Sequence, residues 1–211
     1  MSNVYIFGTS GGCLDSFYLY KELFGESKNL YFLSDSHKVG EKIHGHEVAG
    51  SFEIVKKIST DDSYFVYQCG SSENHKTRNN WFDISLNSGL KPKTLISKDS
   101  YVHQTAKIGH GSIIYPGVKI MANVKIGTNC IILPNTVINH DTKVGDFCII
   151  NSLCVINGSV NIGCNSYVGS STSIKEKIQI TSNVTIGMGS NILKSLDIEG
   201  IYFGSPAMLI R

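Results

Sequence analysis

The sequence predicts two domains of different architecture, an α/β domain over residues 1–95 and a parallel β-solenoid over residues 96–211. Three observations support this prediction. Short runs of β-branched and aromatic residues alternate with helical patterns in the first part. A glycine-rich turn follows the first of those runs. In the second part, Ile or Val recurs at every sixth residue.

The first part alternates predicted strands with predicted helices. The strand candidates are "NVYIF", "NLYFLSD" and "SYFVYQCG", and the helix candidates are "DSFYLYKELF", "SFEIVKKI" and "HKTRNNWFDISLNSG". Strands that alternate with helices form parallel sheets, because each helix returns the chain to the same end of the sheet. We therefore expect a Rossmann-like domain with a nucleotide-type turn after its first strand.

The second part follows a six-residue period. Seventeen consecutive positions at this spacing carry Ile or Val, from Val102 to Ile198. Two residues before these positions the side chain is mostly small or β-branched, as at Ser112, Cys130 and Thr136. Six residues supply one short strand and one turn, so three such units close a triangular coil of eighteen residues. The pattern is the hexapeptide repeat of left-handed parallel β-helices, and the aliphatic side chains should stack inside in ladders.

Composition argues against several classes of function. The net charge of +2, without any basic tract, gives no electrostatic case for nucleic acid or a membrane surface. No signal peptide is apparent, and no apolar run approaches the roughly 20 residues that span a bilayer. No cysteine pair has CxxC spacing, so no metal site is expected, and reduced thiols point to a cytoplasmic protein. The cysteines are Cys13, Cys69, Cys130, Cys148, Cys154 and Cys164.

His140, followed by Asp141, is a candidate general base. Gly158 lies eighteen residues after His140, or one full coil, and should stack over it at about 4.8 Å. A glycine leaves its backbone N–H accessible, and a base beside an amide donor is an arrangement that acyl transfer requires. The alternative is an exposed turn histidine. His110 lies thirty residues from His140, which is not a multiple of eighteen, so it belongs to another edge.

The chain resembles the sugar O-/N-acetyltransferases, a family of hexapeptide-repeat acyltransferases. The motifs are "FGTSGG" after the first strand, "FLSD" after the second, "AKIGHGSIIYPGVKIMANVKIG", "VINHD" and the closing "GIYFGSPAMLIR". The resemblance spans nearly the whole chain. It implies an acetyltransferase of bacterial surface glycan biosynthesis that uses acetyl-CoA as co-substrate and no metal. It also implies a homotrimer, because members of the family pack three β-helices side by side.

The resemblance also assigns residues of the solenoid. His140 matches the general base, Asp141 the acid that orients it, and Gly158 the amide that holds the oxyanion. Ser170 and Met188, one coil apart, match positions whose backbone contacts the pantetheine of acetyl-CoA. The 3′-phosphate would meet lysines that are otherwise solvated surface residues, namely Lys175, Lys177 and Lys194.

In the first domain, the resemblance implies a site for a nucleotide-linked sugar. Gly8, Ser10 and Gly11 would offer backbone donors to phosphate near a helix N-terminus. Asp35, at the end of the second strand, matches an acid that contacts the base or ribose, although a turn or capping role is equally consistent. Gly70, after the third strand, matches a glycine that lines the same cleft.

This chain departs from the family pattern at three positions. Cys13 replaces the last glycine of the fingerprint, Ile149 replaces a second histidine, and Leu133 replaces an asparagine. Three functions stay open. The first is N-acetylation of a nucleotide-linked amino sugar, which the nucleotide-type domain favours. The second is O-acetylation of sialic acid or a related sugar, and the third is a non-catalytic scaffold.

Overall fold

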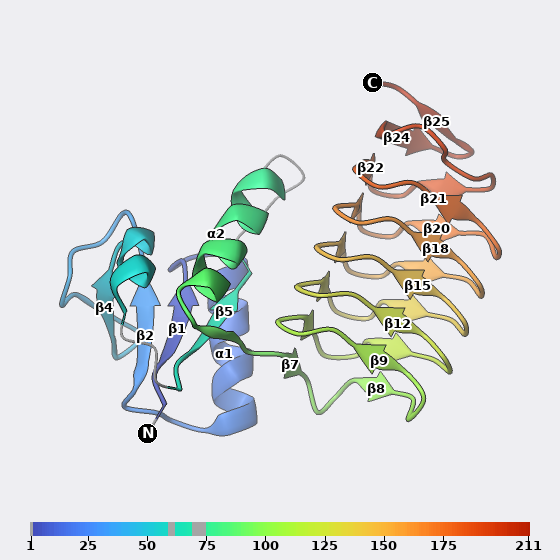
Figure 1. Ribbon diagram of the computed structural model, residues 1–211. Coiled ribbons are helices and arrows are strands. Elements are labelled where there is room, and N and C mark those ends of the chain that lie inside the picture. Colours follow the sequence, from blue (N-terminus) through green and yellow to red (C-terminus); the bar gives the residue numbers. More distant parts are fainter. Residues whose placement is uncertain (1, 59–61, 69–74) are drawn as a thin grey trace. The chain divides into compact units, whose positions relative to one another are not determined.

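The computed structural model describes residues 2–58, 62–68 and 75–211, with the side chains of residues 75–77 excepted. The chain divides into two compact units, Met1–Leu95 and Ile96–Arg211 (Figure 1). The division falls where the sequence changes from alternating strand and helix patterns to the six-residue period.

The first unit is a small α/β unit built on a mixed sheet of six strands, in the order β3-β4-β2-β1-β5-β6. Strand β1 is central and pairs in parallel with β2 on one side and β5 on the other, whereas β3 runs antiparallel to β4. The Rossmann-like assignment remains a prediction. The strands are β1 (Val4–Phe7), β2 (Leu30–Leu33), β3 (Lys42–Ile43), β4 (His46–Gly50), β5 (Tyr64–Tyr67) and β6 (Lys91–Pro92).

Two α-helices and one 3₁₀-helix complete this unit. They are α1 (Gly12–Phe24), α2 (His75–Asn87) and η1 (Phe52–Lys57). The segment "SFEIVKKI", predicted as an amphipathic helix, thus forms the shorter and tighter η1. The aromatic side chains of Phe7, Phe17 and Phe32 are fully buried. Phe17 of α1 packs on Phe32 of β2, whereas Phe7 of β1 contacts Phe52 of η1 and Trp81 of α2.

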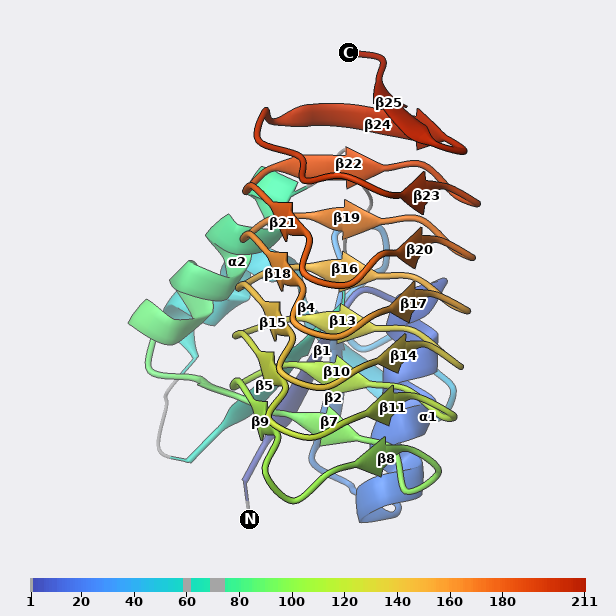
Figure 2. The ribbon, with the colours of Figure 1, turned by 90° about the vertical axis from the view of Figure 1, so that its right-hand side faces the viewer.

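The second unit is a parallel β-helix with three faces, which Figure 2 shows as three columns of strands. One face contains β7 (Leu95–Ile96), β10 (Ile113–Ile114), β13 (Ile131–Ile132), β16 (Ile149–Ile150), β19 (Tyr167–Val168), β22 (Val184–Ile186), β24 (Gly200–Gly204) and β25 (Ala207–Leu209). The second contains β8 (Tyr101–Val102), β11 (Lys119–Ile120), β14 (Val137–Ile138), β17 (Val155–Ile156), β20 (Ser173–Ile174) and β23 (Asn191–Ile192). The third contains β9 (Lys107–Ile108), β12 (Lys125–Ile126), β15 (Lys143–Val144), β18 (Asn161–Ile162) and β21 (Gln179–Ile180).

The register confirms the predicted coil of eighteen residues. Each strand pairs in parallel with the strand one coil later, as in Ile113↔Ile131 and Val137↔Val155. From Ile114 to Ile192, every Ile or Val of the six-residue ladder is buried. Stacked aliphatic side chains exclude water from the narrow interior, and this burial is the main stabilising contribution.

The ladder departs from the prediction at its last position. Ile198 was expected to point inward, yet 63% of its surface is exposed. Leu196 takes the inward place instead, because it bridges Ile180 after sixteen residues rather than eighteen. The last coil is therefore two residues shorter, and the chain continues into the antiparallel hairpin of β24 and β25 at the end of the solenoid (Figure 2).

The corners of the solenoid share one backbone conformation. Every sixth residue from Gly111 to Gly189 has a positive φ, between 48° and 73°. This left-handed region disfavours most side chains, but Gly, Asn and Asp tolerate it. Three of these fourteen positions hold Gly, five hold Asn and one, Asp141, holds Asp. The turn alone therefore accounts for an Asn or Asp at position 141.

Stacked glycines allow the coils to approach closely at another corner. A Cβ built on Gly109 would lie 2.4 Å from the carbonyl carbon and oxygen of Gly127, one coil away. We expect Gly109→Ala to destabilise the solenoid by about 1–3 kcal/mol, because the neighbouring backbone cannot move aside as a side chain can. Thermal unfolding should show a fall of roughly 2–4 °C per kcal/mol.

The matched control is Gly158→Ala. Its new Cβ would meet only the side chain of His140, so the melting temperature should fall less than in Gly109→Ala. Equal falls in the two variants would contradict the argument from backbone contact.

Candidate active site

His140 and Asp141 form a hydrogen-bonded pair at the corner that follows β14. The Nδ1 atom of His140 lies 2.8 Å from Oδ2 of Asp141. Asp141 occupies the left-handed corner position, with φ 61°. The two side chains are 64% and 51% exposed, so in the isolated chain the pair lies on the surface of the solenoid.

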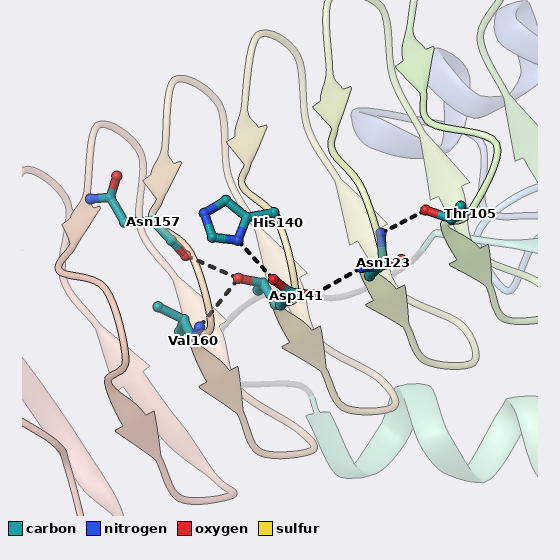
Figure 3. Close-up of polar contacts among 7 residues, drawn as sticks. Thr105, Asn123, His140, Asp141, Asn157 and Val160 are labelled. Carbon is teal, nitrogen blue, oxygen red and sulfur yellow. Dashed lines mark hydrogen bonds and ion pairs between the residues drawn. The ribbon is translucent and has the colours of Figure 1, made fainter.

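A third side chain, which the sequence analysis did not single out, completes this pair. Asn123 lies one coil before Asp141 and donates from Nδ2 to Asp141 Oδ1 at 3.0 Å (Figure 3). The backbone N–H of Asn123 in turn donates to Thr105 Oγ1 at 2.9 Å. Residues 105, 123 and 141 are each eighteen apart, so the spacing alone could have indicated Asn123.

These contacts favour the ionised form of Asp141. The hydrogen bond from His140, and next the one from Asn123, hold the pKa of Asp141 below its usual value. Asp141 is therefore ionised at neutral pH and can accept a hydrogen bond from Nδ1 of His140. A neutral imidazole that donates from Nδ1 presents an unprotonated Nε2, which is the atom that can accept a proton from a bound molecule.

Gly158 lies directly against the imidazole, as the coil spacing predicts. A Cβ built on Gly158 would come within 2.6 Å of Cε1 and 2.7 Å of Nε2 of His140. The amide N–H of Gly158 makes no hydrogen bond to any residue that the structure describes. The amide of His140, at the equivalent corner position, is also free, so the free amide is general to this corner. The specific feature of Gly158 is the absent side chain.

A cleft of about 350 Å³ opens beside His140. Its Asn side chains are held in place, since Nδ2 of Asn139 and of Asn157 donate to backbone carbonyls of the next coil. The carbonyl of Asn157 accepts from Oγ1 of Thr142 at 2.9 Å. The cleft therefore has fixed polar walls. Besides His140, one acidic and one basic side chain line it. Its lining residues are Asn139, His140, Asn157, Gly158, Ser159, Glu176 and Lys177.

Ser170 and Met188 do not lie near His140 within the chain. They follow β19 and β22, whereas His140 and Gly158 follow β14 and β17 on a different face. The two residues are close to one another, because Ser170 accepts from the N–H of Gly189 at 2.8 Å. Met188 is 69% exposed. The predicted acetyl-CoA contacts and the predicted base therefore occupy two different edges of one solenoid.

In the first unit, the glycine turn lies between the carboxyl ends of β1 and β5. The N–H of Gly8 already donates to Leu33 O at 2.9 Å, so the expectation that Gly8 offers a backbone donor is wrong. The amides of Ser10 and Gly11 make no hydrogen bond to the described residues and precede α1. A Cβ on Gly12 would lie 2.5 Å from Nε2 of Gln68, so this glycine permits close packing.

Asp35 has a structural partner in the first unit. Its Oδ1 accepts the N–H of Phe52 at 3.0 Å and so stabilises the start of η1. Beside it, Nδ1 of His37 lies 3.0 Å from the hydroxyl of Ser34 and 3.3 Å from that of Thr9, a cluster that the sequence did not reveal. Gly70 lies outside the described residues.

Three cysteines of the solenoid are packing residues, as predicted. Cys130, Cys148 and Cys154 are fully buried. Burial raises the pKa of the Cys154 thiol to about 11 and that of the Cys148 thiol well above its usual value. These thiols therefore stay protonated and are poor nucleophiles.

The residues that the structure describes lack two kinds of feature. They hold no group of three or more His, Cys, Asp or Glu side chains that could bind a metal ion. Among them, no helix is both long enough and apolar enough to cross a membrane.

The six-residue repeat matches a known family model. Residues 105–140 and 123–158 match the family model "Bacterial transferase hexapeptide (six repeats)". The chain carries the hexapeptide repeat of bacterial transferases. A search of curated protein sequences gave no match.

Solved structures of similar fold cover the entire chain of this hexapeptide-repeat protein. The acetyltransferase domain of PglB from Neisseria gonorrhoeae FA1090 is 21% identical, with a TM-score of 0.90 over 100% of both chains. WeeI from Acinetobacter baumannii AYE is 21% identical, with a TM-score of 0.89 over 100% of both chains. PerB from Caulobacter crescentus, solved with CoA and GDP-perosamine, is 19% identical, with a TM-score of 0.86 over 100% of this chain and 98% of that one.

These similarities confirm the resemblance drawn from the sequence. The second unit has the fold of the left-handed parallel β-helix, and the hexapeptide family and the shared fold agree with the expected acyltransferase class. At these identities the structural likeness itself shows the fold, so the reaction must be argued from the residues of this chain.

Proposed function

We propose that this protein is an acetyl-CoA-dependent N-acetyltransferase that acts on the amino group of a nucleotide-linked amino-deoxy sugar. The observation that carries the proposal is that His140, which is hydrogen-bonded to Asp141, lies against Gly158 in one polar cleft. The fold supports it, since PglB's acetyltransferase domain has been solved with acetyl coenzyme A and PerB with CoA and GDP-perosamine.

The chemistry requires one base and one oxyanion donor. A sugar ammonium is not nucleophilic, so it first loses one proton to water. As the neutral amine attacks the thioester carbonyl, Nε2 of His140 accepts a second proton from the nitrogen. The carbonyl oxygen becomes an oxyanion, and the N–H of Gly158 donates to it. Collapse of the tetrahedral intermediate breaks the C–S bond, and the imidazolium returns a proton to the leaving thiolate of CoA. Asp141 stabilises the imidazolium throughout.

The acceptor is assigned to the first unit. Ser10 and Gly11 place free amides at the N-terminus of α1, where a helix attracts phosphate. Strands β2 and β5 flank β1 on opposite sides, so the carboxyl end of β1 is a topological switch point of the kind that binds nucleotides. A nucleotide-linked sugar therefore suits this chain better than free sialic acid as the acceptor.

The deciding experiment is an assay of purified protein with acetyl-CoA and a panel of nucleotide-linked amino sugars. Mass spectrometry should detect one added acetyl group, and NMR of the product should show an amide rather than an ester. Acetylation of a hydroxyl, or of free sialic acid alone, would establish the O-acetyltransferase alternative.

His140→Ala should lower kcat by about 10²–10⁴-fold, because general base catalysis contributes that much. Calorimetric titration should show acetyl-CoA binding retained, since the variant removes no predicted contact to the cofactor. A loss of less than tenfold at neutral pH would mean that His140 is not the base.

Gly158→Ala should lower kcat while the protein stays folded. The new Cβ would occupy the space of Nε2 and Cε1 of His140, so the exposed imidazole must rotate away from the cleft. We expect a loss of about 10-fold or more, measured by steady-state kinetics beside thermal unfolding. Wild-type turnover in this variant would contradict a catalytic role for the imidazole that lies against Gly158.

We also propose a homotrimer. The His140 edge and the edge of Ser170 and Met188 are different edges of the triangular coil, so one chain does not bring both to the same thioester. A second copy that presents its Ser170 edge beside His140 resolves this separation. Size-exclusion chromatography with light scattering should give three times the chain mass of 23.1 kDa. An active monomer would contradict the shared site.

A further inference from the structure

We propose that Asn123 is a positioning residue for His140, whose side-chain amide holds the Asp141 carboxylate in the orientation that accepts the Nδ1 proton. This inference deepens the proposed function, on which it rests, because it concerns the proton transfer by His140. The side chain of Asn123 donates to Asp141, and Asn123 is not among the residues that line the cleft, so we expect it to act through Asp141.

The carboxylate of Asp141 is held by two donors on its two oxygens. Oδ2 lies 2.8 Å from Nδ1 of His140, and Oδ1 accepts from Nδ2 of Asn123 at 3.0 Å (Figure 3). The Asp141 side chain is 51% exposed, and little else restrains it. A carboxylate without the second donor would rotate toward water and would face Nδ1 for only part of the time. The amide of Asn123 therefore fixes the plane of the carboxylate.

Asn123 is itself fixed by the solenoid. Its backbone N–H donates to Oγ1 of Thr105 at 2.9 Å, and its φ is 61°. Thr105, Asn123 and Asp141 come from three successive coils, whose spacing is set by the β-ladder. The amide is thus preorganised before any substrate binds, which is the property that a positioning residue needs.

Three charged side chains surround the imidazole, and Asn123 is hydrogen-bonded to one of them. Asp141 faces Nδ1, while Glu176 and Lys177 line the cleft from the next coils and carry opposite charges. Asn123 contacts only Asp141 among these groups. Its bond is the second cause, after the bond from His140, of the lowered pKa of the Asp141 carboxyl. Removal of the amide should therefore raise the pKa of Asp141.

The corner conformation provides clean variants and a matched control. Equivalent corner positions in this chain hold glycine at Gly111 and Gly117, so Asn123→Gly removes the amide without backbone strain. Asn123→Asp keeps the size and the tolerance of positive φ but replaces the donor by an acceptor. Asn135 has φ 60° on another corner and no side-chain bond to Asp141, so Asn135→Gly and Asn135→Asp report the generic effect.

The first test does not depend on activity. Carbon-13 NMR of the Asp141 carboxyl should show titration at a higher pH in Asn123→Gly, because a stabilising donor is lost. In Asn123→Asp the titration should move further, since two adjacent carboxylates resist full ionisation. Nitrogen-15 shifts of His140 should show the Nδ1–H form in the wild type and a mixture in the variants. An unchanged titration and an unchanged tautomer in both variants would overturn the inference.

The second test is kinetic. We expect kcat to fall about tenfold in Asn123→Asp, equivalent to about 1.4 kcal/mol, and several-fold in Asn123→Gly. The KM for acetyl-CoA should stay within about twofold, because Asn123 lies outside the cleft. The Asn135 variants should retain wild-type kcat.

The outcomes distinguish this inference from the proposed function. If the wild type acetylates no nucleotide-linked amino sugar, the proposed function fails, while the carboxyl titration still decides whether Asn123 positions the pair. If the wild type is active and Asn123→Asp matches Asn135→Asp in kcat, Asn123 is a turn residue and the inference is wrong.

Discussion

The parallel register between successive coils is the constraint on which the second unit depends. Each strand pairs with the strand eighteen residues later, without a shift, from β8 to β23 on one face. Hydrogen bonds between coils and the buried aliphatic ladder both require this register, since a slip of one residue would turn every Ile outward. The same register stacks functional groups, because any two residues eighteen apart become neighbours.

The candidate site uses this stacking three times. Thr105, Asn123 and Asp141 form one line across three coils, and His140 lies against Gly158 across one. Each link is one strand spacing long, which suits a side-chain hydrogen bond or a ring in contact with a backbone. A repetitive scaffold can therefore hold a catalytic pair rigidly on its surface, although both side chains of the pair are more than half exposed.

At the corner of Asp141, the residue that the turn favours is also one that can pair with His140. A left-handed corner favours Asn, Asp or Gly, and five of the fourteen corners in the regular series hold Asn. An acid beside His140 is therefore compatible with the backbone, and an amide one coil earlier is compatible for the same reason. The corner at Gly158 differs, because its requirement comes from the imidazole above it rather than from φ.

The sequence by itself determined the coil length and the neighbours that follow from it. The unbroken Ile and Val ladder requires eighteen residues per coil, and this predicted the contact of Gly158 with His140 before any coordinates. The same arithmetic separates Ser170 from His140, since thirty residues is not a multiple of eighteen. Tertiary structure alone decided whether stacked side chains meet, as Asn123 and Asp141 do, because backbone spacing does not specify rotamers. The tertiary structure also decided that Leu196 rather than Ile198 points inward, and that the amide of Gly8 donates to Leu33. At both places the six-residue repeat does not specify the partner.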